Sequence, residues 1–247
     1  MMKFNRASTH GVPSLRDWTC GHGSGGQAPR HPPNFIALLF VLKGINMESK
    51  PKHFLDAVKK SKELLESNPL FLDTETTGLD ESAEIVEISI LDVAGNIVFH
   101  SLVKPINPIP HDAMEIHGIT NEEVENAPRF TEIMDDLLNV MTGRKILIYN
   151  EDYDIRLMMQ SARIAGAKRE KIIELFELLD APDATDCIMF LYAMFDGEES
   201  YRGGYKWHKL VAAASKFGVD SSGAHRATAD CLMTIGVLKG IASANDN

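Results

Sequence analysis

Short apolar runs, bounded by polar and turn residues, predict four extended segments in the first two thirds of the chain. Three runs follow one another closely and a fourth, compact run stands alone further on; they cover residues 69–75, 84–93, 96–105 and 145–150. The turn Ala94-Gly95-Asn96 between the second and third runs is typical of a hairpin. The sequence therefore predicts that these two strands pair in an antiparallel manner.

Apolar positions with the spacing of amphipathic helices occur before, between and after these runs. We expect helices over residues 53–68, 130–143, 154–166, 185–195, 207–218 and 228–241. Thr120 and Glu123 have the spacing of a capping box, which predicts a further short helix. Three strands followed by a helix, a strand and a helix indicate an α/β protein whose mixed sheet is flanked by helices, the order expected for a ribonuclease-H-like fold.

Residues 1–46 differ in pattern from the rest of the chain. They are rich in Gly, Pro and His and lack periodicity, so we expect a disordered extension. A globular pattern begins at Met47, which is an alternative start of the protein, and we expect one domain over residues 47–247. The apolar stretch at 35–42 is shorter than the about 20 residues that span a bilayer, and no small-residue cleavage site follows it. We therefore expect no secretory signal and no association with a membrane.

The composition narrows the classes of partner. The net charge is −10, and beyond position 46 there are 20 basic and 34 acidic residues. A broad basic surface for duplex nucleic acid is therefore not expected, and a nucleic-acid contact would be local. The three cysteines lie far apart, which argues against a zinc module or a disulfide framework and favours a reducing, cytoplasmic location.

The stretch FLDTETTGLD at residues 71–80 places two carboxylates directly after a buried apolar run. Side chains alternate between the faces of a strand, so Asp73 and Glu75 point the same way and raise one another's pKa. A divalent cation between them would offset this repulsion, and two carboxylates suit Mg²⁺ or Mn²⁺. The alternative is a polar turn over residues 76–78 with both acids solvated. This stretch alone does not decide between the two.

Two further acids stand at predicted helix starts. Asp154 follows the run at 145–150, in a first helical turn where an acid can simply offset the helix dipole. Asp230 enters the last helix, and His225 precedes it by five residues, which is more than one helical turn. His225 is therefore predicted to lie in the loop before that helix. Its imidazole either reaches a site that Asp230 helps to build or is solvated without a role.

The segments FLDTETTGLD, NEDYDIRLM and HRATAD, in this order and spacing, resemble the three exonuclease motifs of the DEDDh family. This family is typified by the proofreading epsilon subunit of bacterial DNA polymerase III and by ribonuclease T. The resemblance covers about positions 68–240, and KPINPIPHDAMEIHGITNEEV matches it further. Arg226 stands where the sister DEDDy group has tyrosine, which disfavours that group. One departure is Tyr149-Asn150-Glu151, where the family usually has His-Asn, and it bears on substrate affinity.

By this resemblance, two Mg²⁺ or Mn²⁺ ions would be held by four acids, Asp73, Glu75, Asp154 and Asp230. One ion would lower the pKa of an attacking water, and the other would stabilise the leaving 3′ oxygen. The resemblance makes His225 the general base, a role that suits histidine because the unperturbed side chain titrates near neutrality. It places His117 against the terminal nucleotide, with Thr76 and Leu79 as further nucleotide contacts. It implies no organic cofactor.

The resemblance thus implies a metal-dependent 3′→5′ exonuclease that acts on single-stranded or frayed ends and releases nucleoside monophosphates. The form of the first motif resembles the DNA-directed proofreading members more than the oligoribonuclease members, so DNA is favoured over RNA. An RNA-trimming exoribonuclease of the same fold is one alternative. A non-catalytic module that binds nucleic acid or protein is another, although neither an acid nor the histidine is missing. Association with a DNA polymerase is left open.

Overall fold

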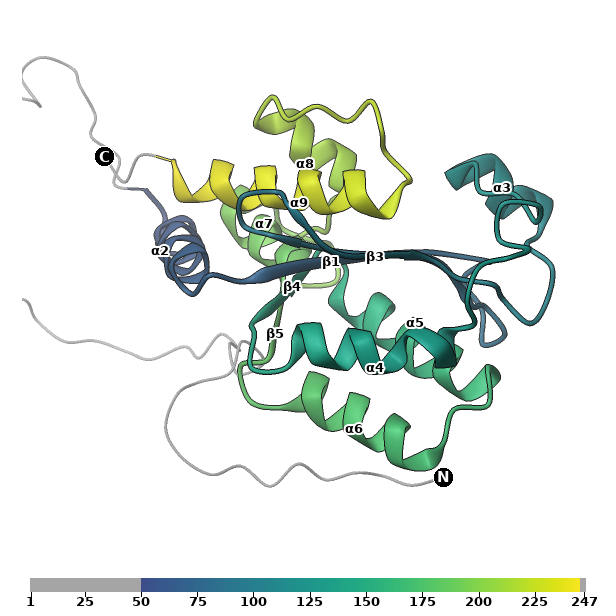
Figure 1. The fold of residues 1–247 in the computed structure, drawn as a ribbon. Helices are drawn as coiled ribbons and strands as arrows, with labels where there is room; N and C mark the ends of the chain where they lie inside the picture. The colour runs from purple at the N-terminus through teal and green to yellow at the C-terminus, as the bar shows by residue number, and fades with distance from the viewer. Residues whose placement is uncertain (1–49, 245–247) are drawn as a thin grey trace, which may run out of the picture. The chain divides into compact units, whose positions relative to one another are not determined.

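The computed structural model describes residues 50–244 of the 247-residue chain (Figure 1). The extension predicted over residues 1–46 lies outside the described residues. The strands are β1 (Leu70–Thr76), β2 (Ile85–Asp92), β3 (Ile97–Leu102), β4 (Ile146–Ile148) and β5 (Thr185–Cys187). The helices are α2 (Lys52–Glu66), α3 (His111–His117), α4 (Phe130–Met141), α5 (Glu151–Ile164), α6 (Arg169–Asp180), α7 (Ile188–Asp196), α8 (Leu210–Lys216) and α9 (Ala227–Ala242). Over this part of the chain, no helix has the length and apolar character needed to cross a bilayer.

The strands form one mixed sheet in the order β3-β2-β1-β4-β5. β2 pairs antiparallel with both β1 and β3, whereas β4 runs parallel to both β1 and β5. A tight turn joins β2 to β3, and its Gly95 has a φ of +91°, which glycine adopts without steric penalty. The predicted hairpin and the predicted α/β mixed sheet flanked by helices are confirmed.

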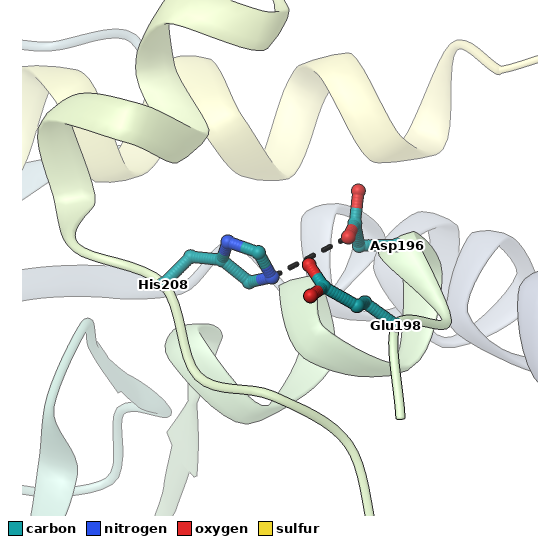
Figure 2. Close-up of side chains that lie close together, drawn as sticks. All are labelled: Asp196, Glu198 and His208. Atoms are coloured by element: carbon teal, nitrogen blue, oxygen red, sulfur yellow. Dashed lines mark ion pairs between the residues drawn. The ribbon is translucent and has the colours of Figure 1, made fainter. Parts of the chain in front are cut away.

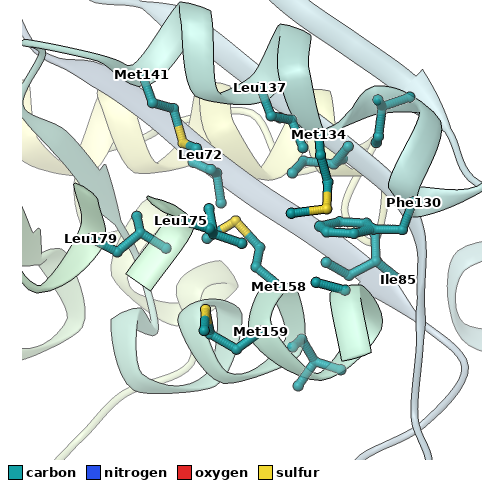
Figure 3. Packing of buried hydrophobic residues seen from close by; sticks show 14 of the residues in the cluster. Leu72, Ile85, Phe130, Met134, Leu137, Met141, Met158, Met159, Leu175 and Leu179 are labelled. Carbon is teal, nitrogen blue, oxygen red and sulfur yellow. The ribbon is translucent and has the colours of Figure 1, made fainter. Parts of the chain in front are cut away.

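Helices cover both faces of the sheet: α4, α5 and α6 lie on one side, and α2, α7, α8 and α9 on the other (Figure 1). The residues of β1 alternate between these layers, as strand geometry requires. Leu72 belongs to the core beneath α4 and α5, and Phe71 belongs to the core beneath α9. Figure 3 shows the first core, to which Leu72 of β1, Phe130 and Met134 of α4 and Met158 of α5 all belong. Every second residue of β1 therefore faces α9.

Two glycines allow α9 to approach its neighbours closely. A Cβ atom added at Gly236 would lie 2.6 Å from the Val219 side chain, and one added at Gly240 would lie 2.3 Å from the Phe217 ring. Both distances are far shorter than a carbon–carbon contact. A glycine inside a helix is less favourable than alanine by about 1 kcal/mol, and here the close packing requires it. This packing fixes the helix that carries Asp230.

The structure contains three elements that the sequence pattern does not predict, namely α3, α6 and β5. In α6 only Leu175 and Leu179 are buried, so its apolar stripe is short and easily overlooked. α3 has only seven residues, His111–His117, which is too short for a helical repeat of apolar positions to be evident. The prediction of one helix over residues 185–195 was wrong at its start, because residues 185–187 pair with β4 and the helix begins at Ile188.

The predicted capping box forms, but the helix behind it does not. The Thr120 N–H donates to Glu123 Oε2 at 2.7 Å, and the Glu123 N–H donates to the Thr120 hydroxyl at 3.3 Å. Residues 121–126 nevertheless continue as a series of turns. A capping box satisfies the first N–H groups of a helix, yet it does not supply the further turns that make a helix persist.

Candidate active site

Asp73 and Glu75 lie toward the carboxyl end of β1, on the face of the sheet that α9 covers. Phe71, two residues before Asp73, packs in the core beneath α9, so alternate residues of the strand face the same layer. Asp230 lies in the first turn of α9. One carboxylate oxygen from each of the three acids lies within 4.8 Å of the others. A strand and a helix that are distant in sequence thus build one acidic cluster.

Asp154 approaches this cluster from a third element. It lies in the first turn of α5, just after β4, and its side chain is buried. The Thr74 hydroxyl donates a hydrogen bond to Asp154 Oδ1 at 2.7 Å, which joins the start of α5 to β1. The Asp154 charge is close enough to raise the pKa of both Asp73 and Glu75. The structure therefore brings together all four acids that the sequence singles out.

Burial and mutual repulsion make these acids difficult to ionise without a cation. Burial, followed by the charges of Asp230, Glu87 and Asp154, raises the pKa of Glu75 to about 8. Burial raises the pKa of Asp154 to about 7 and the pKa of Asp73 well above its usual range. A bound divalent cation would replace the lost hydration and offset the repulsion, and Mg²⁺ and Mn²⁺ prefer carboxylate oxygens. The residues present therefore fit a site for divalent metal.

Without divalent cations, the free energy of unfolding is expected to fall as the pH rises from about 4.5 to about 8. Across that range the folded protein keeps a proton on Glu75, whose pKa is about 8, while the unfolded chain has already released it. This contribution to stability is complete below the unfolded pKa and disappears as the pH passes the folded pKa. Thermal unfolding in EDTA measures it, and Mg²⁺ should flatten the dependence. A melting temperature in EDTA that increases across this range would contradict the assignment.

His225 lies in the loop between α8 and α9, as its spacing from Asp230 predicts. Its φ is +67°, in the left-handed region that residues other than glycine seldom occupy. The His225 side chain is exposed, and its backbone N–H donates to Asp230 Oδ1 at 3.1 Å. The loop therefore holds an accessible imidazole whose backbone is tied directly to one acid of the cluster.

The three predicted nucleotide contacts lie at or near the carboxyl end of β1. The Thr76 hydroxyl is hydrogen-bonded to the Gly78 carbonyl at 3.0 Å and to the Tyr153 hydroxyl at 2.7 Å. Leu79, in the loop that follows, is 80% exposed. His117 is buried at the end of α3; burial lowers its pKa, and the neighbouring Thr76 backbone opposes that shift. The Leu79 side chain is thus accessible to a ligand, whereas the Thr76 hydroxyl is engaged within the protein.

Glu87 also belongs to this site, although the sequence pattern did not single it out. Its signal in the sequence is a charge within the apolar run EIVEISIL. It lies directly opposite Glu75 in the pairing of β1 with β2, and its side chain is only 2% exposed. Burial acts to raise its pKa, but hydrogen bonds from Arg226 and His100 hold the pKa of Glu87 below its usual value. Glu87 is therefore a buried, ionised carboxylate beside the acidic cluster.

A second group of metal-ligand residue types lies between α7 and α8 (Figure 2). Asp196, Glu198 and His208 each place one ligand-type atom within 4.8 Å of the others. His208 Nε2 lies 3.3 Å from Asp196 Oδ2. Asp196 also pairs with Lys216, and Glu198 pairs with Lys206 at 2.7 Å. Since each carboxylate already has an ammonium partner, an ion-pair network accounts for this group, and no metal ion is needed to explain it.

Comparisons with known proteins identify the family of the chain. Residues 70–238 match the model of the RNase_T family, described as Exonuclease. The uncharacterized exonuclease CP81 of Escherichia phage 186 is 44% identical over 185 residues, which is 74% of this chain and 93% of that protein. The DNA polymerase III subunit epsilon of Rickettsia felis is 32% identical over 160 residues, which is 62% of this chain and 64% of that protein. The chain thus matches less than two thirds of the length of this epsilon relative.

The fold has solved counterparts. The crystal structure of E. coli Exonuclease I in complex with a dA16 oligonucleotide has a TM-score of 0.52 at 19% identity, over 67% of this chain and 38% of that one. At this identity the likeness supports the fold alone. The family match extends over most of the described residues and includes β1, α5 and the start of α9, which carry the acids. The chain therefore belongs to the RNase_T exonuclease family, within the DEDD-type 3′→5′ exonucleases, and is a nuclease that hydrolyses phosphodiester bonds.

Proposed function

We propose that the chain removes nucleoside monophosphates one at a time from single-stranded or frayed 3′ ends, with DNA as the favoured polymer, by a two-metal mechanism. One observation carries the proposal. Asp73 and Glu75 from β1, Asp230 from α9 and Asp154 from α5 converge on one site whose electrostatics disfavour four free carboxylates. Such a site is stable in its ionised form when divalent cations neutralise it.

Each acid has a defined part in this scheme. Asp73, Glu75 and Asp230 would provide the oxygens that lie within 4.8 Å of one another, and Asp154 would complete the ligand set for two Mg²⁺ or Mn²⁺ ions. When bound, such ions activate water and offset the negative charge of a scissile phosphate. The hydrogen bond from Thr74 holds the Asp154 carboxylate in place at 2.7 Å. The protein thus fixes its ligands through both the sheet and the first turns of two helices.

The loop histidine supplies the acid–base chemistry. His225 would accept the proton of the attacking water as general base, from an exposed position beside Asp230. Leu79, His117 and the backbone at Thr76 would contact the terminal nucleotide. The exposed Leu79 side chain offers an apolar surface to a base, in a protein whose net charge of −10 provides little attraction for phosphates.

The choice of DNA rests on the relatives. The epsilon relatives are subunits of a DNA polymerase. The same relatives support association with a DNA polymerase as a second candidate role. An RNA-trimming exoribonuclease would use the same acids and histidine, so it is distinguished only by the substrate. A non-catalytic binding module is disfavoured because the acids and the histidine are all present.

Matched single-stranded DNA and RNA oligomers test the proposal. Oligomers with a 5′ label, incubated with the purified full chain and Mg²⁺, should give a ladder that shortens from the 3′ end, and DNA should shorten faster. The label should stay on long products until late in the reaction, and EDTA should stop cleavage. A block of phosphorothioate linkages at the 3′ end should protect the oligomer, while the same block at the 5′ end should not. Faster cleavage of RNA would refute the preference for DNA, and cleavage from the 5′ end would refute the mechanism.

A further inference from the structure

Glu87 and Glu75 form an unusual cross-strand pair. The two residues are directly opposite each other in antiparallel strands, so both side chains leave the same face of the sheet. Like charges in such positions repel each other. Glu87 also raises the pKa of both Asp73 and Glu75. A second carboxylate at this position opposes the formation of the acidic cluster, so its presence calls for a role.

All the described partners of Glu87 lie at the start of α9 or on β3. Arg226 Nε donates to Glu87 Oε2 at 3.0 Å and Arg226 Nη2 donates to Oε1 at 2.8 Å, a two-pronged pairing that fixes both direction and distance. The Ala227 N–H donates to Oε2 at 3.0 Å, so Glu87 also satisfies a free N–H group at the first turn of α9. His100 Nε2 lies 3.0 Å from Oε1.

These contacts fix the backbone that follows His225, and Asp230 fixes the N–H group of His225 itself. Arg226 and Ala227 directly follow His225 and are anchored to β2 through Glu87. The His225 N–H is itself held by Asp230 Oδ1 at 3.1 Å. Between these anchors the His225 backbone has a left-handed φ of +67°, a conformation that persists only when its surroundings impose it. The direction of the imidazole therefore depends on the anchors.

We propose that the Glu87 carboxylate and the Arg226 guanidinium form a positioning pair that holds the loop of His225 over the acidic cluster. The proposal rests on the proposed role of His225 as general base. A buried ion pair is weak evidence of added stability, because desolvation offsets much of the attraction. A bidentate arginine is better suited to fix geometry. Glu87 and Arg226 act through His225 and touch neither the substrate nor the reacting atoms.

Glu87→Gln tests the pair, because it keeps the shape of the side chain and removes the charge. We expect kcat at saturating Mg²⁺ and oligonucleotide to fall by about 10- to 100-fold, the range that a displacement of about 1 Å can cause. KM should stay within about twofold, since the substrate contacts are intact. Arg226→Lys keeps the charge but not the two-pronged contact, so its loss of kcat should be smaller. Arg226→Gln, at a half-exposed side chain, repeats the test if Glu87→Gln does not fold.

Asp186→Asn is the matched control. Asp186 is a largely buried acid on β5, paired with Lys145 at 2.7 Å and Lys60 at 3.4 Å. The substitution Asp186→Asn removes an ion pair from the same sheet and does not alter the loop of His225. The melting temperature of Asp186→Asn should fall about as much as that of Glu87→Gln, and its kcat should be unchanged. Hydrogen exchange gives a readout independent of activity: the amides of residues 224–228 should exchange faster in Glu87→Gln and not in Asp186→Asn.

A double-mutant cycle separates positioning from a general loss of structure. In the His225→Ala background, Glu87→Gln should reduce kcat no further, because the group that it positions is absent. Additive losses, together with unchanged exchange at residues 224–228, would overturn the positioning role while leaving His225 as the base. Full activity of the His225→Ala single variant would overturn both the base and the positioning pair. The two failures are therefore distinguishable.

Discussion

Asp73→Asn is expected to abolish hydrolysis and, in EDTA at about pH 9, to raise the melting temperature of the protein. Turnover should fall by about a thousandfold or more, because a catalytic metal site supplies several kcal/mol and each 1.4 kcal/mol is a factor of ten. Stability should rise because burial, Asp154, Asp230 and Glu75 all disfavour a charge at Asp73. Oligonucleotide digestion with Mg²⁺ and thermal unfolding in EDTA measure the two effects.

Asp92→Asn is a control that should change the melting temperature in the opposite direction. Asp92 ends β2, and hydrogen bonds from Asn96 hold its pKa below the usual value. Loss of this charge should therefore lower the melting temperature slightly and leave turnover unchanged. If Asp73→Asn retains turnover within about tenfold of the wild type, far less than the loss expected for a metal ligand, Asp73 is not a ligand.

His225→Ala is expected to reduce kcat by about 10²- to 10⁴-fold, the usual contribution of a general base. Binding of Mg²⁺ with a non-hydrolysable oligonucleotide, measured by calorimetry, should barely change, because none of the four acids is altered. At saturating Mg²⁺ the wild-type rate should rise with pH, since only a neutral imidazole accepts a proton. That rise should disappear from the profile of the variant.

His111→Ala serves as the control for this substitution. His111 is an exposed histidine at the start of α3, paired with Glu115. Its replacement should leave both kcat and the pH profile unchanged. If the His225→Ala protein keeps more than about a tenth of the wild-type activity, it retains far more than the loss of a general base allows. The base would then be another residue. That result would leave the proposed metal site unchanged, because none of the four acids is altered.

The four acids could be singled out from the sequence because the three motifs that contain them resemble, in order and spacing, those of a known exonuclease family. Asp73 and Glu75 follow a short apolar run that predicts a strand, and Asp154 and Asp230 stand at the starts of helices. The register of β1 with β4 then brings the ends of the two strands together. Sequence spacing also placed His225 in a loop. Local patterns thus predict the elements that carry these residues, and the resemblance predicts their shared role.

The remaining features depend on contacts between distant segments. β5 has three residues, Thr185–Cys187, and is recognisable only by its pairing with β4, because so short and polar a segment has no apolar periodicity of its own. Glu87 and Arg226 are 139 residues apart, and nothing in either segment identifies the other as its partner. In the sequence, Arg226 served only to mark the absence of tyrosine. The positioning role that we propose for Arg226 follows only from its contact with Glu87 in the folded structure.

The left-handed backbone at His225 has a consequence for the evolution of the chain. A φ of +67° is tolerated better by asparagine or glycine than by histidine. Replacement by asparagine would therefore suit the fold at least as well and would leave the four acids unchanged. Natural selection for folding or for metal binding alone gives no reason to retain histidine at this position. If His225 is the general base that we propose, selection for turnover retains the histidine. A lineage released from that selection would then drift into a stable but inactive descendant through this one residue.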